Sequence, residues 1–375
     1  MNIDAAAYRD LSVSPRILLG PGPSMVHPRV LRAMATPLVG HLDPEFLVFM
    51  REIQDLLRYV FRTRNEITIP MSGTGSAGME AALCNFIEPG DPVLIAINGY
   101  FGLRLADMAA RYGADVFTIE RPWGEVFDPE ELEAALRQRQ YKLLALVHAE
   151  TSTGALQPHI GEIAAAAHRY GALLVLDTVT SLGGVPVEID AWGVDVAYSG
   201  TQKCLSVPPG LAPLTVSERA REALRRRQSP VANWYLDLSL VEKYWGEERT
   251  YHHTAPISMN YALREGLRLV AEEGLEARWA RHRENARQLW EGLQRLGLQL
   301  LVPEDYRLAT LTTPLVPEGV DEAAVRHRLL QEYNIEIAAG FGPLKGKIWR
   351  IGLMGFSSRR ENVALLLTAL AEILG

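Results

Sequence analysis

The chain lacks several features that mark broad classes of protein. It has two cysteines in 375 residues, Cys84 and Cys204, which are too few for a disulfide framework and cannot by themselves build a metal site. No apolar run is long enough to span a bilayer. The first residues have neither the basic region nor the apolar stretch of a signal peptide, so the cytoplasm is the expected compartment. Internal repeats and low-complexity tracts are also missing.

An excess of positive charge is absent as well. The formal net charge is −7 and the isoelectric point is near 5.8, which argues against a general binder of nucleic acid or of anionic membranes. With 48% hydrophobic and 22% charged residues, the composition is that of an ordinary globular protein. At 375 residues, the chain is long enough for a large domain and a smaller one.

Short apolar runs alternate with helix-like segments from about residue 25 to residue 215. Expected strands lie at 67–71, 92–97, 115–119, 142–147, 172–176 and 194–198, and expected helices at 103–112, 129–139 and 160–170. Continuous apolar strands separated by helices predict an α/β fold with a mostly parallel sheet covered on both faces.

The pattern of expected helices and strands changes after about residue 255. A long charged helix is expected over 258–296, with a break at Gly274 and a stop at Gly297. Short strands at 298–302, 308–312 and 348–353 and a terminal helix from Arg360 complete a smaller α+β domain. We therefore expect an irregular N-terminal arm (1–24), a large domain (25–257) and a small C-terminal domain (258–375).

A lysine and an aspartate follow two of the expected strands. Lys203 comes after the run 194–198 among small polar residues, and Asp177 ends the run 172–176. A lysine in such a place can form a Schiff base, and a carboxylate on a neighbouring strand can hold a protonated pyridine nitrogen. Together they are the protein half of pyridoxal phosphate chemistry. The alternative is a solvated loop lysine and an aspartate that caps a helix.

Three other polar segments also follow expected strands. Segment 72–80 opens a helix with small residues, where a phosphate is favoured, although an ordinary capped helix start is the alternative. It matches neither the Walker loop nor the dinucleotide fingerprint. Segment 98–102 offers an aromatic ring for stacking or for packing under a helix, and segment 148–154 offers hydroxyls or is simply a turn. A parallel sheet would bring these strand ends to one crevice.

With these segments the chain resembles the class V, fold type I pyridoxal-phosphate aminotransferases, in their alanine–glyoxylate and serine–pyruvate branch. The resemblance is collinear over nearly the whole chain and is carried by segments 20–23, 40–44, 72–75, 98–102, 148–154, 176–184, 198–203, 251–254 and 349–353. It implies the fold type I architecture, in which a large domain has a mostly parallel seven-stranded-type sheet covered by helices and a smaller α+β domain follows. It also implies pyridoxal 5′-phosphate as the cofactor.

The resemblance further implies roles for individual residues. Lys203 would attach the cofactor and shuttle the substrate proton, and Asp177 would pair with the pyridinium nitrogen. Val179 would pack under the ring, and Phe101 would stack above it, where many family members carry a tryptophan. The remaining cofactor contacts implied are Ser152 for the phenolic oxygen, Thr74, Gly75, Ser76 and Gln202 for the phosphate, and Tyr251 and Thr254 from the second subunit of a homodimer.

Substrate contacts are implied at Arg350, Gly22 and Ser152. A two-point contact with an α-carboxylate suits the guanidinium of Arg350, although an arginine in a strand is otherwise more often an edge residue or an ion-pair partner. Ser76 stands where some relatives carry histidine, which leaves the substrate preference of those relatives open for this chain. No cysteine follows Cys204, which argues against cysteine desulfurase chemistry.

The expected reaction is ping-pong transfer of an amino group from alanine or serine to glyoxylate or another small 2-oxo acid. No second carboxylate-binding arginine is identifiable, which favours small neutral side chains. The alternatives are a transaminase or lyase for another small substrate, such as an aminophosphonate or a phosphorylated amino acid, and a non-catalytic binding protein on the same fold. The expected partners are small molecules and a second copy of the chain, without nucleic acid, membrane or metal.

Overall fold

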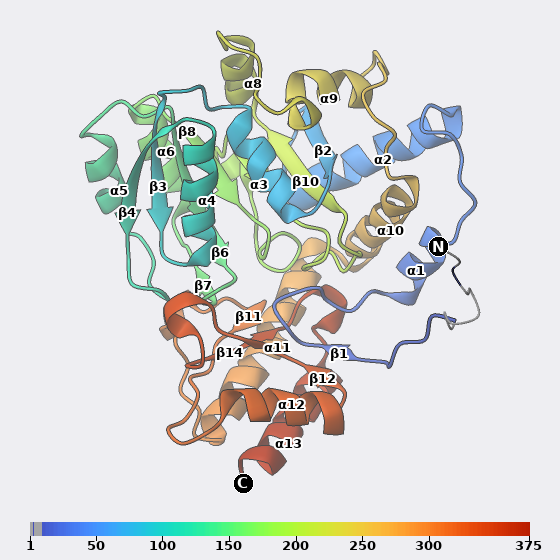
Figure 1. Ribbon diagram of the computed structural model, residues 1–375, viewed down its shortest axis with the longest axis vertical. Coiled ribbons are helices and arrows are strands. Elements are labelled where there is room, and N and C mark those ends of the chain that lie inside the picture. Colours follow the sequence, from blue (N-terminus) through green and yellow to red (C-terminus); the bar gives the residue numbers. More distant parts are fainter. Residues whose placement is uncertain (1–2, 4–9) are drawn as a thin grey trace.

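A seven-stranded sheet forms the centre of the larger part of the computed structural model, which describes residue 3 and residues 10–375 (Figure 1). Residues 1–2 and 4–9 of the expected arm lie outside the described residues. Along the sheet the strands are β2 (Ile67–Ser72), β10 (Leu211–Val216), β9 (Val196–Tyr198), β8 (Leu173–Asp177), β5 (Leu143–Val147), β3 (Pro92–Ile97) and β4 (Asp115–Glu120).

Only β10 runs against its neighbours in this sheet. It pairs antiparallel with β2 and β9, whereas the β9–β8, β8–β5, β5–β3 and β3–β4 pairs are parallel. The predicted mostly parallel sheet is therefore confirmed. Six of its seven strands match the expected apolar runs, and every residue of β5 and β8 is buried, as expected for strands covered on both faces. The seventh strand, β10, is not among the expected strands.

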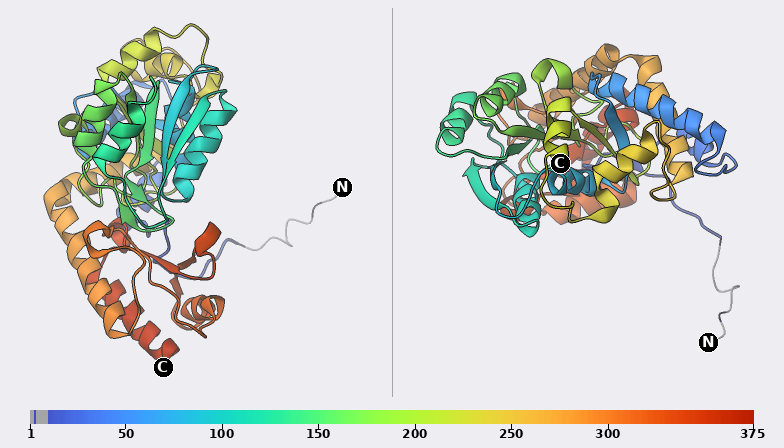
Figure 2. Two further views of the ribbon diagram at one scale, coloured as in Figure 1. Left: turned by 90° about the vertical axis from the view of Figure 1, so that its left-hand side faces the viewer. Right: turned by 90° about the horizontal axis from the view of Figure 1, so that it is seen from above.

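Helices cover both faces of the sheet (Figure 2). Alternate strand residues point to opposite faces, so Ile95 packs in one hydrophobic core and Leu94 in the other. The Ile95 side carries α3 (Gly75–Cys84) and α4 (Tyr100–Arg111). The Leu94 side carries α2 (Pro44–Phe61), α5 (Pro129–Leu136), α6 (Ile160–Arg169) and part of α10 (Ile257–Glu273).

The smaller part contains a three-stranded sheet backed by helices. Its strands are β11 (Leu311–Thr312), β14 (Trp349–Gly352) and β13 (Ala338–Ala339), and its helices are α11 (Leu275–Arg295), α12 (Glu322–Glu332) and α13 (Arg360–Leu374). The fully buried Trp349 lies in its core. Strand β1 (Ile17–Leu18) also belongs here, because it pairs with β12 (Ile335–Glu336).

Two of the expected strands in this part are wrong in extent. Segment 298–302 is no strand, and its only ladder contact is an isolated bridge between Leu300 and Pro314. The hydrogen bonds that flank this bridge run from the N–H of Leu301 to the carbonyl of Thr313 and from the N–H of Leu315 to the carbonyl of Gln299, and the pairing goes no further. Of segment 308–312, only the last two residues form a strand.

The helix expected over 258–296 is confirmed, with its break. It consists of α10 and α11, which meet at Gly274 with φ +80°, and Gly297 follows its end with φ +78°. Helix α10 packs on α1 (Pro28–Met34) and α2, while α11 packs on α13. The two helices thus link the larger and smaller parts, and the domain division at residues 257–258 stays a prediction.

Short elements complete the chain. They are β6 (Ala149–Glu150), β7 (Ala155–Leu156), α7 (Ile189–Trp192), α8 (Glu218–Arg225), η2 (Trp234–Leu236), α9 (Leu238–Trp245), η3 (Glu304–Tyr306), η4 (Gly342–Leu344) and η5 (Gly355–Ser357). Within the described part of the chain, none of the helices combines the length and the apolar character needed to cross a bilayer.

The packing of α3 on the sheet gives a test of the fold. A Cβ at Gly78 would lie 3.0 Å from the Cβ of Ala212 and 3.2 Å from the Cβ of Tyr198. Gly78→Val should therefore push α3 off the sheet and lower the free energy of unfolding by roughly 1–3 kcal/mol in urea denaturation. Ala110→Val, at an exposed position of α4, is the control and should cost under about 0.7 kcal/mol. Equal losses in the two variants would contradict this account of the packing.

Candidate active site

Lys203 and Asp177 lie at the ends of adjacent strands. Asp177 is the last residue of β8 and pairs in register with Tyr198, the last residue of β9. Lys203 follows in the loop from β9 to β10. Its exposure is 8% and that of Asp177 is 2%. The chain has five lysines, and Lys203 alone is buried, whereas Lys142, Lys243, Lys345 and Lys347 are half-buried or exposed.

Burial shifts both groups away from their ordinary titration. It lowers the pKa of Lys203 to about 8, and the nearby charge of Arg350 acts in the same direction. Burial also raises the pKa of Asp177 to about 6, although the carboxylate accepts hydrogen bonds from the N–H of Val179 and the hydroxyl of Tyr198, both at 2.8 Å. The site therefore holds an amine that loses its proton near neutral pH and a carboxyl group suited to a cationic partner.

A tight turn leaves room for the lysine side chain. The Nζ of Lys203 donates a hydrogen bond to the carbonyl oxygen of Pro21. A Cβ at Gly22 would lie 2.8 Å from both Cδ and Nζ of Lys203, and Gly22 has φ +107°. Glycine is thus required at position 22 for two reasons: its backbone conformation disfavours other residues, and any Cβ would collide with the Lys203 side chain.

The start of α3 and the loop after β9 form a cradle of small groups. Thr74 is the N-cap of α3, but its side chain makes no capping hydrogen bond, and the first turn has no acidic residue. A Cβ at Gly200 would lie 3.4 Å from the Cα of Gly75 and 2.9 Å from the Oε1 of Gln202. This Oε1 is buried without a hydrogen-bond partner in the described chain, and Val179 lies beside Gly75.

These features fit a phosphate-bearing cofactor such as pyridoxal phosphate. An uncapped helix start presents N–H groups and the positive end of the helix dipole to an anion. The side-chain amide of Gln202 carries an NH₂ group as well as this oxygen, and a half-turn of the amide would present that donor to the phosphate instead. A buried amine and a buried carboxyl group also lie close to the ends of adjacent strands. The amine can react with the aldehyde of that cofactor, and the carboxyl group can pair with its pyridine nitrogen.

Ser152 is held by Glu150, a residue whose role the sequence did not reveal. The Ser152 hydroxyl donates to Glu150 Oε1 at 2.6 Å and accepts from the N–H of Tyr100 at 2.9 Å. Glu150 also accepts from the N–H groups of Ser152 and Phe101. Burial raises the pKa of Glu150 to about 7. The hydroxyl hydrogen of Ser152 is therefore directed at Glu150, and it is free for another acceptor only when it turns or Glu150 carries a proton.

Arg350 reaches the site from the smaller part. It lies on β14 with 4% exposure, and its guanidinium carbon is 3.9 Å from the ring centre of Phe341. Its Nε donates to the carbonyl of Ala339 at 2.7 Å and its Nη1 to the carbonyl of Thr151 at 3.4 Å. Burial lowers the pKa of Arg350 to about 10, so it stays charged at neutral pH. The N–H groups that remain can bind a carboxylate at two points.

Two predicted residues are not brought to Lys203 and Asp177 within one chain. Tyr251 is 57% exposed and lies against His41, with ring centres 5.2 Å apart, and Thr254 is also exposed. The segment between them still approaches the sheet, because the Nε2 of His253 is 2.7 Å from the hydroxyl of Ser72. Both side chains are accessible to a second copy of the chain.

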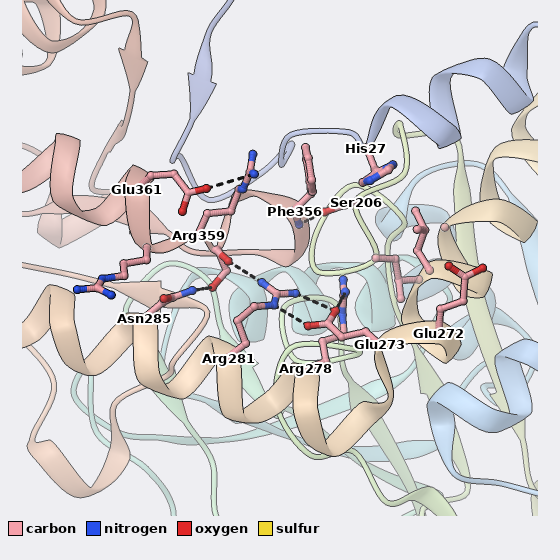
Figure 3. Close-up of a pocket in the computed structure, with 15 residues that line it drawn as sticks. His27, Ser206, Glu272, Glu273, Arg278, Arg281, Asn285, Phe356, Arg359 and Glu361 are labelled. Carbon is pink, nitrogen blue, oxygen red and sulfur yellow. Dashed lines mark hydrogen bonds and ion pairs between the residues drawn. The ribbon is translucent and has the colours of Figure 1, made fainter.

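Behind the Lys203 loop lies a separate cavity of about 620 Å³ (Figure 3). Ser206 lines it from the loop and Arg281 from α11, and the figure shows Arg281 directed at Glu273. Arg281 also donates a hydrogen bond to the carbonyl of Ser358. None of the residues predicted for cofactor or substrate lines this cavity. Its arginines and glutamates mostly pair with one another, so it supports the loop rather than extending the site.

Arg104 and Tyr198 were also missed by the sequence reasoning. Tyr198 ends β9 opposite Asp177, and a signal for it was an aromatic residue at a strand end next to the critical carboxylate. Arg104 lies one helical turn after Phe101, and this i, i+3 spacing was the available signal. Its Nη1 donates to the hydroxyl of Ser76 at 3.1 Å.

Comparisons with known proteins agree with this geometry. A family described as aminotransferase class V matches residues 17–353. The solved structure of an alanine–glyoxylate aminotransferase from Nostoc sp. is 58% identical, covers 100% of both chains and superposes with a TM-score of 0.97. The (S)-ureidoglycine–glyoxylate transaminase of Bacillus subtilis is 44% identical over 98% of this chain and 92% of its own. The alanine–glyoxylate aminotransferase of Callithrix jacchus is 44% identical over 98% and 90%.

The lowered pKa of Lys203 predicts how the stability of the cofactor-free protein depends on pH. Between about 8 in the folded protein and 10.5, the ordinary value, the unfolded chain binds more protons, so wild-type stability rises with pH in this range. Lys203→Met should thus be more stable than wild type at neutral pH, and this gap should shrink by roughly 1 kcal/mol between pH 7 and pH 9 in urea denaturation. The exposed substitution Lys345→Met is the control. A stability difference between Lys203→Met and wild type that does not change with pH would contradict the lowered pKa of Lys203.

Proposed function

The chain belongs to the class V aminotransferases, whose cofactor is pyridoxal phosphate, and on this premise we propose that it transfers the amino group of a small amino acid to glyoxylate or another small 2-oxo acid. The proposed donor is alanine or serine, and the proposed order of events is ping-pong. The observation that carries the proposal is the pair of buried groups, Lys203 and Asp177, with the guanidinium of Arg350 close enough to lower the pKa of the lysine.

Lys203 and Asp177 have the central roles in this proposal. When bound, pyridoxal phosphate supplies the electron-withdrawing ring that accepts the electron pair left on the substrate Cα. Lys203 would hold the cofactor through Nζ. When a substrate amine replaces it there, the same Nζ would act as the base that takes the Cα proton and then as the acid that returns it. Asp177 would pair with the pyridine nitrogen and keep it protonated. Burial supports both roles, because it favours the neutral amine of Lys203 and makes an unpaired Asp177 carboxylate unfavourable, so that this carboxylate is stabilised when a cation pairs with it.

The other proposed cofactor contacts follow the cradle and the aromatic turn. Val179 and Phe101 would flank the ring, and Ser152 would bond the phenolic oxygen. For Ser152, the hydrogen bond to Glu150 means that donation to the cofactor requires the hydroxyl to turn or Glu150 to be protonated. The proposed phosphate contacts are the uncapped α3 start and the loop after β9, at Thr74, Gly75, Ser76 and Gln202.

Arg350 is the proposed anchor for the substrate carboxylate. Its two hydrogen bonds go to backbone carbonyls rather than to a carboxylate, so its charge is available to an acid. Gly22 and Ser152 are the other proposed substrate contacts, and the close approach of Gly22 to Lys203 supports the first. The acceptor is supported by the relatives, because glyoxylate is part of the name of each of the three compared above.

We further propose a homodimer whose sites are shared. Tyr251 and Thr254 of the partner subunit would complete the phosphate site. The exposed aromatic side chains Trp234 (62%), Tyr235 (43%) and Tyr251 (57%) support a buried contact in the assembled protein. Two buried free cysteines suit a reducing compartment, and we propose the cytoplasm, with small molecules as the only other partners.

Steady-state kinetics test the proposed reaction. Alanine, serine, (S)-ureidoglycine, an aminophosphonate and a phosphorylated amino acid are each paired with glyoxylate, serine is also paired with pyruvate, and kcat/KM is measured for every pair. We expect alanine or serine with glyoxylate to give the highest value and Lys203→Ala to abolish turnover. Preference for an aminophosphonate or a phosphorylated amino acid, or release of ammonia and a 2-oxo acid from serine without amination of the acceptor, would favour the alternative reactions. Normal turnover in Lys203→Ala would contradict the proposal.

Arg350→Lys tests the carboxylate anchor. Lysine keeps the charge but loses the planar two-point contact, so kcat/KM for the amino donor should fall about 10- to 100-fold, mainly through KM. Arg307→Lys is a matched control, because Arg307 also donates through Nε to a backbone carbonyl and lies over an aromatic ring, that of Trp290. An unchanged KM in Arg350→Lys would place the substrate carboxylate elsewhere.

A further inference from the structure

Arg104 lies beside the proposed phosphate site without having a role there so far. It is half-buried on α4, and its guanidinium carbon is 4.9 Å from the ring centre of Phe101 and 5.3 Å from that of Tyr100. Its Nη1 donates to the hydroxyl of Ser76, the second residue of α3, at 3.1 Å. The guanidinium thus reaches from the stacking aromatic residue to the start of the helix that forms the cradle.

The charge of Arg104 is not neutralised by the residues that the structure describes. Its one hydrogen bond goes to a neutral hydroxyl, and no Asp or Glu oxygen of residues 10–375 lies within the 4.0 Å of an ion pair. A guanidinium has five N–H groups, so most of those on Arg104 are available to an acceptor. A half-buried guanidinium in this condition is suited to an anionic ligand.

The cradle itself lacks a positive side chain. Thr74, Gly75, Ser76 and Gln202 are all neutral, so within the chain a phosphate dianion would depend on backbone N–H groups and on a helix dipole equivalent to about half a charge. Arg104 is near enough to act on the same site, because its charge adds to the lowering of the pKa of Lys203 and opposes the rise in the pKa of Asp177, although burial is the dominant influence on both.

We propose that Arg104 is a phosphate-binding residue of this site and that its free N–H groups hold the phosphate monoester of the cofactor at the start of α3. This inference rests on the proposed function, because it concerns how the same cofactor is retained. On this proposal, the charge of Arg104 is the main reason why the site binds pyridoxal phosphate more tightly than pyridoxal. The competing role is structural, in which Arg104 only fixes Phe101 and Ser76.

Binding of two ligands that differ only in the phosphate separates these roles. The full-length protein is freed of cofactor and titrated with pyridoxal phosphate and with pyridoxal, and the dissociation constant Kd of each is measured from the quenching of tryptophan fluorescence. The variants are Arg104→Met, which removes the charge, and Arg104→Gln, which keeps a donor for Ser76. Arg111→Met is the matched control, since Arg111 is on the same helix but 73% exposed and paired with Asp107.

We expect both Arg104 variants to raise Kd for pyridoxal phosphate about 10- to 100-fold and to leave Kd for pyridoxal within about twofold of wild type. Arg111→Met should change neither constant. Inorganic phosphate should compete with pyridoxal phosphate on wild type and do so more weakly on the variants. If Arg104→Met fails to fold, Arg104→Gln alone decides the question.

Two results would overturn the inference while leaving the proposed function intact. One is a Kd for pyridoxal phosphate that is unchanged in the variants. The other is an equal rise in Kd for both ligands, which would show the structural role. A wild-type protein that binds neither ligand would instead contradict the proposed function, and the inference with it.

Discussion

The burial of one amine and one carboxyl group at the ends of adjacent strands is the constraint on which the site depends. Because β8 and β9 are parallel neighbours, the chain leaves both at the same edge of the sheet, and Asp177 and the Lys203 loop emerge side by side. Dehydration disfavours the charged form of each group, which lowers the pKa of Lys203 and raises that of Asp177. A cofactor with an aldehyde and a basic ring nitrogen offsets both effects at once, so retention of the cofactor and reactivity of the lysine have the same physical origin.

The loop that carries Lys203 is held from behind by polar contacts. The hydroxyl of Ser24 donates to the carbonyl of Lys203 at 2.7 Å, and Arg278 donates to the carbonyls of Cys204 and Gly183. Arg278 lies on α11, the helix that connects the larger part to the smaller part, and the smaller part also carries Arg350. The placement of the lysine relative to the proposed carboxylate anchor is therefore tied to the junction of the two parts, where Glu273 forms ion pairs with Arg278 and Arg281.

Much of this architecture could be predicted from local sequence. Apolar runs located six of the seven strands of the large sheet, β10 being missed, and Gly274 marked the break between α10 and α11. The family, the fold class and the cofactor are confirmed by the comparisons. The strand expected at 298–302 was wrong because an apolar run indicates burial and not strand pairing, and this segment pairs only at the isolated bridge of Leu300 with Pro314. Glu150 and Arg104 were missed because their partners, Phe101 and Ser76, are distant in sequence and meet only in the fold. The roles of the site residues stay predictions.

The most direct test of the central claim is to identify which lysine carries the cofactor. The holoenzyme is reduced with borohydride, which fixes the cofactor on its lysine, and is then digested for peptide mapping by mass spectrometry. The chain has five lysines, so the outcome is unambiguous. The account predicts the modification on Lys203 alone, the one buried lysine. Modification of Lys142, Lys243, Lys345 or Lys347, or of none, would contradict it.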